Sequence, residues 1–149
     1  KDENFVKESL KDKNVQIIKN IDDIMVYGFE NEFIQVIINI LNNSKDEFEK
    51  IVIEEKIILI DTKVIKNRIS ICIKDNAGGI SDKFINKIFD LYFTKGKEKG
   101  TGIGLYMSKE IIEKHMKGSI SVVNDIYIFN EKSYKGAAFT INFPLKKEK

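Results

Sequence analysis

The sequence has one cysteine, one histidine and no tryptophan among its 149 residues. A single cysteine, Cys72, excludes an internal disulfide, and a single histidine, His115, excludes a multi-histidine metal site. No apolar run approaches the ~20 residues that a membrane-spanning helix needs. Neither sign of charge dominates either, because the formal net charge is only +2. The composition therefore gives no reason to expect nucleic acid or an anionic membrane as a partner.

The remaining composition is that of an ordinary globular protein. Hydrophobic residues make up 42% of the chain and charged residues 32%, and the length is usual for one domain. The first residues, Lys-Asp-Glu-Asn, include no initiator Met and do not form a secretory signal. We therefore expect residues 1–149 to form a single domain, cut from a longer protein.

The hydrophobic pattern mixes helical and strand periodicities. The apolar residues between Phe5 and Leu10 predict a short first helix that leads into a strand near residues 15–19. Further helices are predicted over 31–50, 81–90 and 105–116, the last ended by Gly118, and further strands over 56–61, 67–74, 119–123 and 137–143. This mixture predicts an α/β fold with one layer of sheet and one layer of helices.

The predicted helix over 31–50 carries a stripe of amides. Gln35, Asn39 and Asn43 recur at every fourth position, so they lie on one side of an otherwise apolar helix. Buried amides need polar partners, and an amide oxygen is a hard ligand that suits Mg²⁺. The simpler interpretation is a stripe that faces solvent, since Asn and Gln are mostly exposed.

A second motif, Asp-Asn-Ala-Gly-Gly-Ile, occupies residues 75–80 at the end of a predicted strand. Asp75 has the same parity as the alternating isoleucines before it, so its carboxylate is predicted to point into the core. A carboxylate there can accept hydrogen bonds from an adenine amino group, and the glycines allow a base to approach the backbone closely. An ordinary turn is the alternative, because Asp-Asn and Gly-Gly are common in turns.

A third motif, Gly-Thr-Gly-Ile-Gly-Leu, occupies residues 100–105 directly before a predicted helix. Its glycines and the helix N-terminus suit a phosphate, and Lys95, Lys97 and Lys99 lie just upstream. The alternative is a loop that only connects two elements. The spacing matches neither a P-loop nor a dinucleotide fingerprint, and the H-R-D and D-F-G triplets of eukaryotic-type kinases are missing.

In this order, the three motifs resemble the catalytic domain of sensor histidine kinases, which shares a superfamily with gyrase and heat-shock chaperone ATPases. Residues 38–43 resemble its N box, 75–79 its first glycine box, 89–95 its F box and 100–105 its second glycine box. The resemblance covers essentially the whole chain. It implies a Bergerat-type fold, a two-layer sandwich of a mixed sheet packed on helices, with ATP and Mg²⁺ as cofactors.

The resemblance also implies roles for individual residues. Asn43 would coordinate Mg²⁺, Asn39 would assist at the phosphates, and Asp75 would hold the adenine amino group. Residues 90–101 would form a lid, and Lys95 would join Asn39 and Asn43 in catalysis. The remaining implied nucleotide contacts are Gly79 at the base and Thr94, Lys95, Thr101, Gly102, Ile103, Gly104 and Leu105 around the phosphates.

The function implied is transfer of the ATP γ-phosphate to a histidine on a separate dimerisation domain, from which a response regulator is phosphorylated. ATP-hydrolysing relatives place a Glu at the position of Asn39, and an amide cannot replace it as a general base. An ATPase-driven clamp, a nucleotide sensor and a serine kinase of the anti-sigma type are the alternatives. His115 is interpreted as a structural or surface residue. The expected location is the cytoplasm, with or without an inner-membrane anchor on the parent protein.

Overall fold

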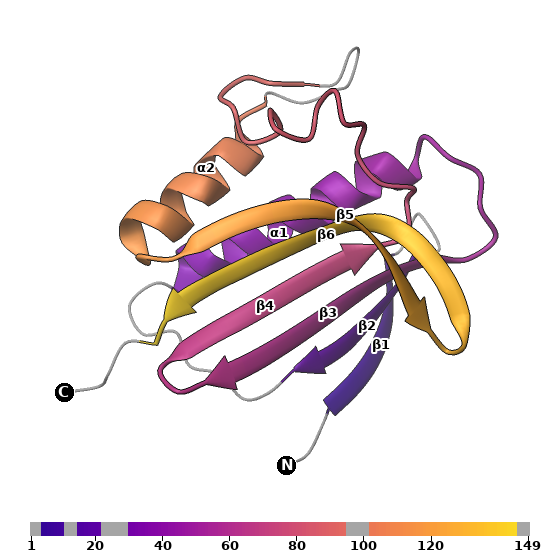
Figure 1. Ribbon diagram of the computed structural model, residues 1–149, viewed down its shortest axis with the longest axis horizontal. Coiled ribbons are helices and arrows are strands. Elements are labelled where there is room, and N and C mark those ends of the chain that lie inside the picture. Colours follow the sequence, from indigo (N-terminus) through magenta and orange to yellow (C-terminus); the bar gives the residue numbers. More distant parts are fainter. Residues whose placement is uncertain (1–3, 11–14, 22–29, 95–101, 146–149) are drawn as a thin grey trace.

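The computed structural model describes residues 4–10, 15–21, 30–94 and 102–145. Figure 1 shows a single twisted sheet with helices packed on one of its faces. Along the chain the elements are β1 (Asn4–Leu10), β2 (Val15–Ile21), α1 (Glu30–Phe48), β3 (Lys56–Ile65), β4 (Arg68–Asp75), α2 (Gly104–Glu110), the π-helical turn η1 (Ile111–His115), β5 (Ser119–Phe129) and β6 (Lys132–Pro144).

The six strands form one mixed sheet in the order β1-β2-β3-β4-β6-β5. Strands β2 and β3 are parallel and the other neighbouring pairs are antiparallel. A parallel pair needs a long crossover connection, and α1 lies in that connection. The predicted α/β sandwich with a mixed sheet is therefore confirmed.

The core lies between the helices and one face of the sheet. In β4 the buried residues Ile69, Ile71 and Ile73 alternate with half-buried ones, as predicted. On α1 the buried residues are spaced by four positions, at Val36, Ile40, Ser44 and Phe48, which is the spacing of one helix face. A fully buried isoleucine contributes about 1.5–3 kcal/mol relative to an exposed one, so this face holds the two layers together.

Two predicted helices are wrong. Residues 4–10 form strand β1, which pairs with β2 so that Phe5 lies opposite Asn20 and Leu10 opposite Val15. Residues 81–90 form successive turns, with the Phe84 and Ile85 amides both donating to the carbonyl of Ser81 at 2.9 and 3.0 Å. In residues 4–10 the apolar residues are too few to fix a periodicity. In residues 81–90 the apolar residues do have helical spacing, but the backbone forms separate turns, most of whose hydrogen bonds span three residues.

Other boundaries differ from the prediction by a few residues. The closing hairpin is longer than predicted, because all of β5 pairs with β6, from Ser119 opposite Asn142 to Phe129 opposite Lys132. The helix after the third motif changes to π-helical geometry at residue 111, and the left-handed residue at its end is Lys117, with φ of +59°, instead of Gly118.

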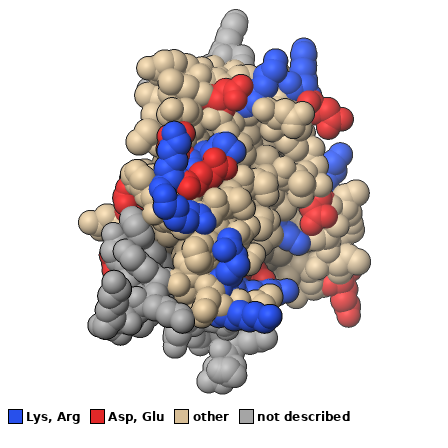
Figure 2. All heavy atoms as spheres, turned by 60° about the vertical axis from the view of Figure 1, so that its left-hand side comes forward, with Lys and Arg blue, Asp and Glu red and all other residues tan. Residues whose placement is uncertain are grey.

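The surface carries charges of both signs. Figure 2 shows basic and acidic side chains interspersed over one face of the molecule. Within the described ranges, no helix combines the length and the apolar character needed to cross a membrane.

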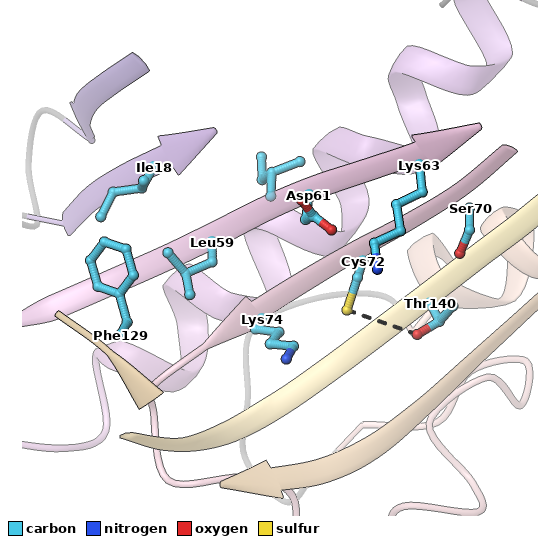
Figure 3. Close-up of a pocket in the computed structure, with 10 residues that line it drawn as sticks. Ile18, Leu59, Asp61, Lys63, Ser70, Cys72, Lys74, Phe129 and Thr140 are labelled. Atoms are coloured by element: carbon cyan, nitrogen blue, oxygen red, sulfur yellow. Dashed lines mark hydrogen bonds between the residues drawn. The ribbon is translucent and has the colours of Figure 1, made fainter. Parts of the chain in front are cut away.

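The face of the sheet opposite the helices carries a hollow of about 490 Å³. Figure 3 shows Leu59, Lys63, Cys72 and Phe129 around it. Apart from Ile60, its β3 and β4 residues alternate with those of the core, so this hollow and the buried carboxylate of Asp75 lie on opposite faces of the sheet. Burial raises the pKa of the Cys72 thiol, which disfavours the reactive thiolate.

Candidate functional site

Asp75 is the last residue of β4 and is only 2% exposed. Its Oδ1 accepts hydrogen bonds from the backbone amides of Ala77 and Ala137 at 3.0 and 3.2 Å, and its Oδ2 accepts one from the Ser44 hydroxyl at 2.8 Å. Burial raises the pKa of Asp75, and these three donors oppose that rise. A carboxylate has about four acceptor positions, so Asp75 is held in place with capacity for one further donor. Its predicted inward orientation is confirmed.

The glycines after Asp75 shape the next turn. Gly78 and Gly79 have φ of +95° and +94°, a conformation that side chains disfavour. Asn124 of β5 holds the turn, because its Oδ1 accepts from the Ile80 amide and its Nδ2 donates to the Ile80 carbonyl, both at 2.7 Å. A Cβ on Gly79 would lie 2.7 Å from that Oδ1. The turn therefore needs glycine at position 79 for its own packing.

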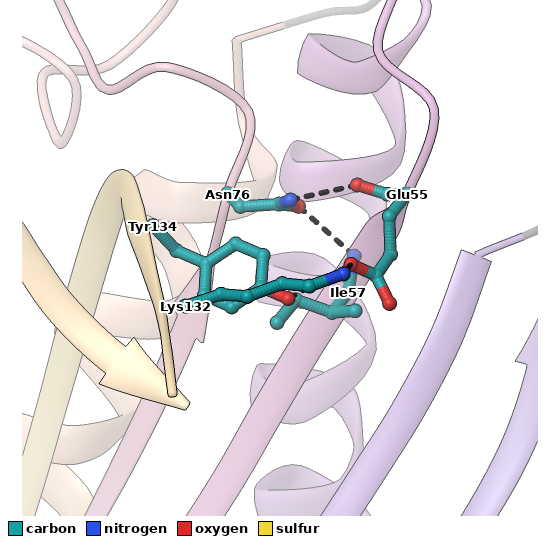
Figure 4. A network of polar contacts seen from close by, with 5 residues as sticks. All are labelled: Glu55, Ile57, Asn76, Lys132 and Tyr134. Carbon is teal, nitrogen blue, oxygen red and sulfur yellow. Dashed lines mark hydrogen bonds and ion pairs between the residues drawn. The ribbon is translucent and has the colours of Figure 1, made fainter. Parts of the chain in front are cut away.

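The second residue of this motif, Asn76, has a structural role. Its Oδ1 accepts from the Ile57 amide at 2.9 Å and its Nδ2 donates to the Glu55 carbonyl at 2.7 Å. Figure 4 shows the Glu55 carboxylate also meeting Tyr134, whose hydroxyl donates at 2.8 Å, and Lys132, at 3.5 Å. These contacts tie the turn after β4 to the start of β3 and to the β5–β6 hairpin.

Asn39 joins α1 to α2. Its Nδ2 donates to the carbonyl of Gly104 and to the hydroxyl of Ser108, both at 2.9 Å, and its Oδ1 accepts from Gln35 at 2.9 Å. Ser108 is fully buried and its hydroxyl also donates to the Gly104 carbonyl at 2.9 Å. Both N–H groups of the Asn39 amide are thus used within the protein, and its oxygen accepts one hydrogen bond from the described residues, of the two that it could accept.

Asn43 lies one turn further along α1 and is half-buried. Its Nδ2 is buried and has no hydrogen-bond partner within the described part of the chain, which costs free energy unless a polar ligand meets it. Rotation of the side-chain amide by half a turn exchanges this nitrogen with the amide oxygen, so the oxygen of Asn43 can occupy the same position as a metal ligand. Among the described residues no group of three or more His, Cys, Asp or Glu could hold a metal. The amide of Asn43 is compatible with Mg²⁺, which is commonly bound through few protein ligands together with phosphate oxygens.

The third motif opens α2. Gly102 has φ of +71°, its carbonyl accepts from the Tyr92 amide at 2.9 Å, and a Cβ on it would lie 2.5 to 2.8 Å from the backbone of Tyr92 and Phe93. The structure describes five of the site residues predicted in this region, and all five are half-buried: Thr94, Gly102, Ile103, Gly104 and Leu105. The other two, Lys95 and Thr101, lie outside the described residues.

Residues 28–147 match the family described as histidine kinase-, DNA gyrase B- and HSP90-like ATPase. The chain belongs to this ATPase family. Among the relatives of this ATPase domain are two proteins of Bacillus subtilis (strain 168). A probable C4-dicarboxylate sensor kinase is 32% identical over 119 residues, which are 80% of this chain and 21% of the relative. Sporulation kinase A is 34% identical over 125 residues, 84% of this chain and 18% of the relative. The ATPase domain thus spans about a fifth of the length of these relatives.

Solved structures share the fold of the ATPase domain. The mycobacterial sensor histidine kinase MprB superposes with a TM-score of 0.69 at 18% identity, over 87% of this chain and 83% of that one. Full-length ShkA, in complex with AMPPNP, superposes with a TM-score of 0.68 at 18% identity, over 90% of this chain and 26% of that one.

Sequence reasoning missed three residues of this ATPase domain: Ser44, Ser108 and Asn124. The sequence pattern could have identified Ser44, since it is a serine at the helical spacing of the buried stripe of α1, whose other three members are apolar. Asn124 gave none, because its partner Ile80 lies 44 residues earlier. His115 lies on the surface, with its Nδ1 2.6 Å from Glu32 Oε2, in keeping with the surface role predicted for it.

Proposed function

We propose that this domain binds MgATP and transfers the γ-phosphate to a histidine on a separate dimerisation and phosphoacceptor domain of a longer sensor kinase. A response regulator would then take the phosphoryl group from that histidine. The observation that carries the proposal is the buried Asp75 carboxylate, which is held by three donors and keeps acceptor capacity for an adenine amino group. Two relatives, a probable C4-dicarboxylate sensor kinase and sporulation kinase A, and the AMPPNP complex of ShkA support it.

In this proposal the nucleotide lies between Asp75 and the start of α2. Asp75 accepts the adenine amino group, and the backbone at Gly79 lines the base. Gly102, Ile103, Gly104 and Leu105 would surround the phosphates with their backbone, and Thr94 would contact them as well. Lys95 and Thr101 belong to the same proposed set but lie outside the described residues. Asn43 would hold Mg²⁺, which neutralises phosphate charge and orients the leaving group when it is bound.

Phosphoryl transfer needs positioning more than covalent chemistry from the protein. A nitrogen of the acceptor imidazole forms the new bond to the γ-phosphorus, the bond from that phosphorus to the bridging oxygen breaks, and ADP leaves with the electron pair. Asn39 favours this acceptor over water, because an amide cannot take a proton from water and both of its N–H groups already bind α2. A chain with this residue would hydrolyse ATP slowly on its own.

Calorimetric titration with ADP and AMPPNP, with and without Mg²⁺, tests the binding step. Magnesium-dependent binding that is lost in Asp75→Asn supports the proposal, and the absence of binding in every condition would refute it.

The transfer step is tested by adding labelled ATP and the phosphoacceptor domain of the parent kinase. Acid-labile label on that domain indicates phosphohistidine. Acid-stable label would identify a serine kinase instead, and rapid phosphate release without label would identify an ATPase.

A further inference from the structure

Ser44 is a buried hydroxyl in the apolar stripe of α1, with an exposed fraction of 1%. It donates to Oδ2 of Asp75 at 2.8 Å across 31 residues of sequence. The other two donors to Asp75 are backbone amides, from the following turn and from β6, and both bind Oδ1. Among the described residues, the Ser44 hydroxyl is therefore the hydrogen-bond donor that fixes the second carboxylate oxygen, and a side-chain substitution can remove it.

We propose that Ser44 is a positioning residue that holds the Asp75 carboxylate in the orientation and charge state that an adenine amino group needs. The inference rests on the proposed function, because it assumes that Asp75 accepts the base. It assigns no contact between Ser44 and the nucleotide.

The surroundings of Asp75 explain why this hydroxyl matters. Within the described part of the chain, Glu47 on α1 and the phenol of Tyr127 on β5 are the ionisable groups found to interact with the carboxylate, and both are acids. Neither can offset a buried negative charge, so hydrogen bonds must do so. Burial raises the pKa of Asp75, and the Ser44 hydroxyl is one of three donors that lower it.

Removal of the Ser44 hydroxyl would favour the protonated carboxyl. A carboxyl proton can occupy the side of Oδ2 from which the base should donate, so the acceptor is lost when the proton binds. Nucleotide affinity in such a variant should therefore fall most at acid pH, where the raised pKa of Asp75 leaves more of the protein protonated.

Ser44 also directly follows Asn43 on α1. One turn of this helix thus carries both Ser44, which contacts the Asp75 carboxylate, and Asn43, which is proposed to bind the metal. A shift of this turn would change both ends of the nucleotide site together.

The test compares wild type with Ser44→Ala and with Ser44→Cys, which keeps the size of the side chain but donates weakly. Thr140→Val is the matched control, because it removes a hydroxyl that contacts Cys72 Sγ at 3.9 Å on the other face of the sheet. ADP affinity is measured calorimetrically from about pH 5 to about pH 8, and the Asp75 carboxyl carbon is titrated by NMR in the ligand-free proteins.

We expect Ser44→Ala to lose about tenfold in affinity at the acid end and less at the alkaline end, because a hydrogen bond to a charged group is lost. Asp75 should titrate at higher pH in this variant, Ser44→Cys should be intermediate, and Thr140→Val should match wild type. If Ser44→Ala does not fold, Ser44→Cys carries the same comparison.

An unchanged pH profile and an unchanged Asp75 titration would overturn the inference. A raised Asp75 titration in proteins that bind no ADP at any pH would instead refute the proposed function, while the effect of Ser44 on Asp75 would stand. The two failures are therefore distinguishable.

Discussion

Gly78 and Gly79 have almost the same backbone conformation, with φ of +95° and +94°, but different surroundings. A Cβ on Gly78 would meet no atom of the described residues within 4 Å, whereas a Cβ on Gly79 would lie 2.7 Å from Oδ1 of Asn124. The pair allows backbone strain to be separated from a steric clash, because Gly78→Ala introduces only the strain and Gly79→Ala introduces both.

The expected magnitudes follow from these contacts. Strain at such a φ costs about 1–3 kcal/mol in either variant. In Gly79→Ala the Asn124 amide must also move, and its two hydrogen bonds to Ile80 are each worth about 0.5–1.5 kcal/mol. Gly79→Ala should therefore lower the free energy of unfolding by about 1–3 kcal/mol more than Gly78→Ala does.

Urea denaturation of both variants measures this difference, provided that the slope of each transition is unchanged. Repeating the pair in an Asn124→Ala background completes a thermodynamic cycle. In that background the two alanine substitutions should cost the same. Equal costs in the presence of Asn124, or an excess for Gly79→Ala that persists without it, would refute the reasoning.

Three further predictions concern the proposed nucleotide site and the surface. Asn43→Ala should weaken ADP binding in calorimetry much more with Mg²⁺ than without it, and equal losses would contradict a metal role. Burial raises the pKa of Asp75 above its ordinary 3.8, so wild type should lose stability relative to Asp75→Asn as pH rises through that raised pKa. Denaturation at several pH values measures the difference in unfolding free energy between the two proteins, and a difference that does not change with pH would contradict this prediction. His115→Gln should lower the free energy of unfolding by less than about 1 kcal/mol, because its contact with Glu32 is exposed, and should retain phosphotransfer; loss of labelling would contradict its surface role.

Features that depend on local periodicity could be predicted from the sequence. The alternation of isoleucines in β4 gave the direction of Asp75, and α1 begins and ends within two residues of its predicted bounds. Both elements are long and amphipathic, so their pattern identifies the buried face without knowledge of the partner.

Features that depend on distant partners could not be predicted. Strand β1 exists because Phe5 and its neighbours pair with β2, and a short apolar segment does not reveal such pairing. The contacts of Asn39 with Ser108 and of Ser44 with Asp75 span 69 and 31 residues. Only the fold brings these side chains together, although a serine in the buried stripe of α1 indicates that some partner is needed.

The hydrogen bond from the Tyr92 amide to the Gly102 carbonyl brings the two ends of the intervening segment together at a fixed distance of 2.9 Å. The entropic cost of bringing the ends of a chain segment together rises only with the logarithm of its length, by about 0.6 kcal/mol for each doubling. Residues inserted between Tyr92 and Gly102 therefore leave the start of α2 and its contact with Asn39 unchanged at little cost in folding free energy. The length of this segment can thus change without moving the residues of α2 that Asn39 contacts.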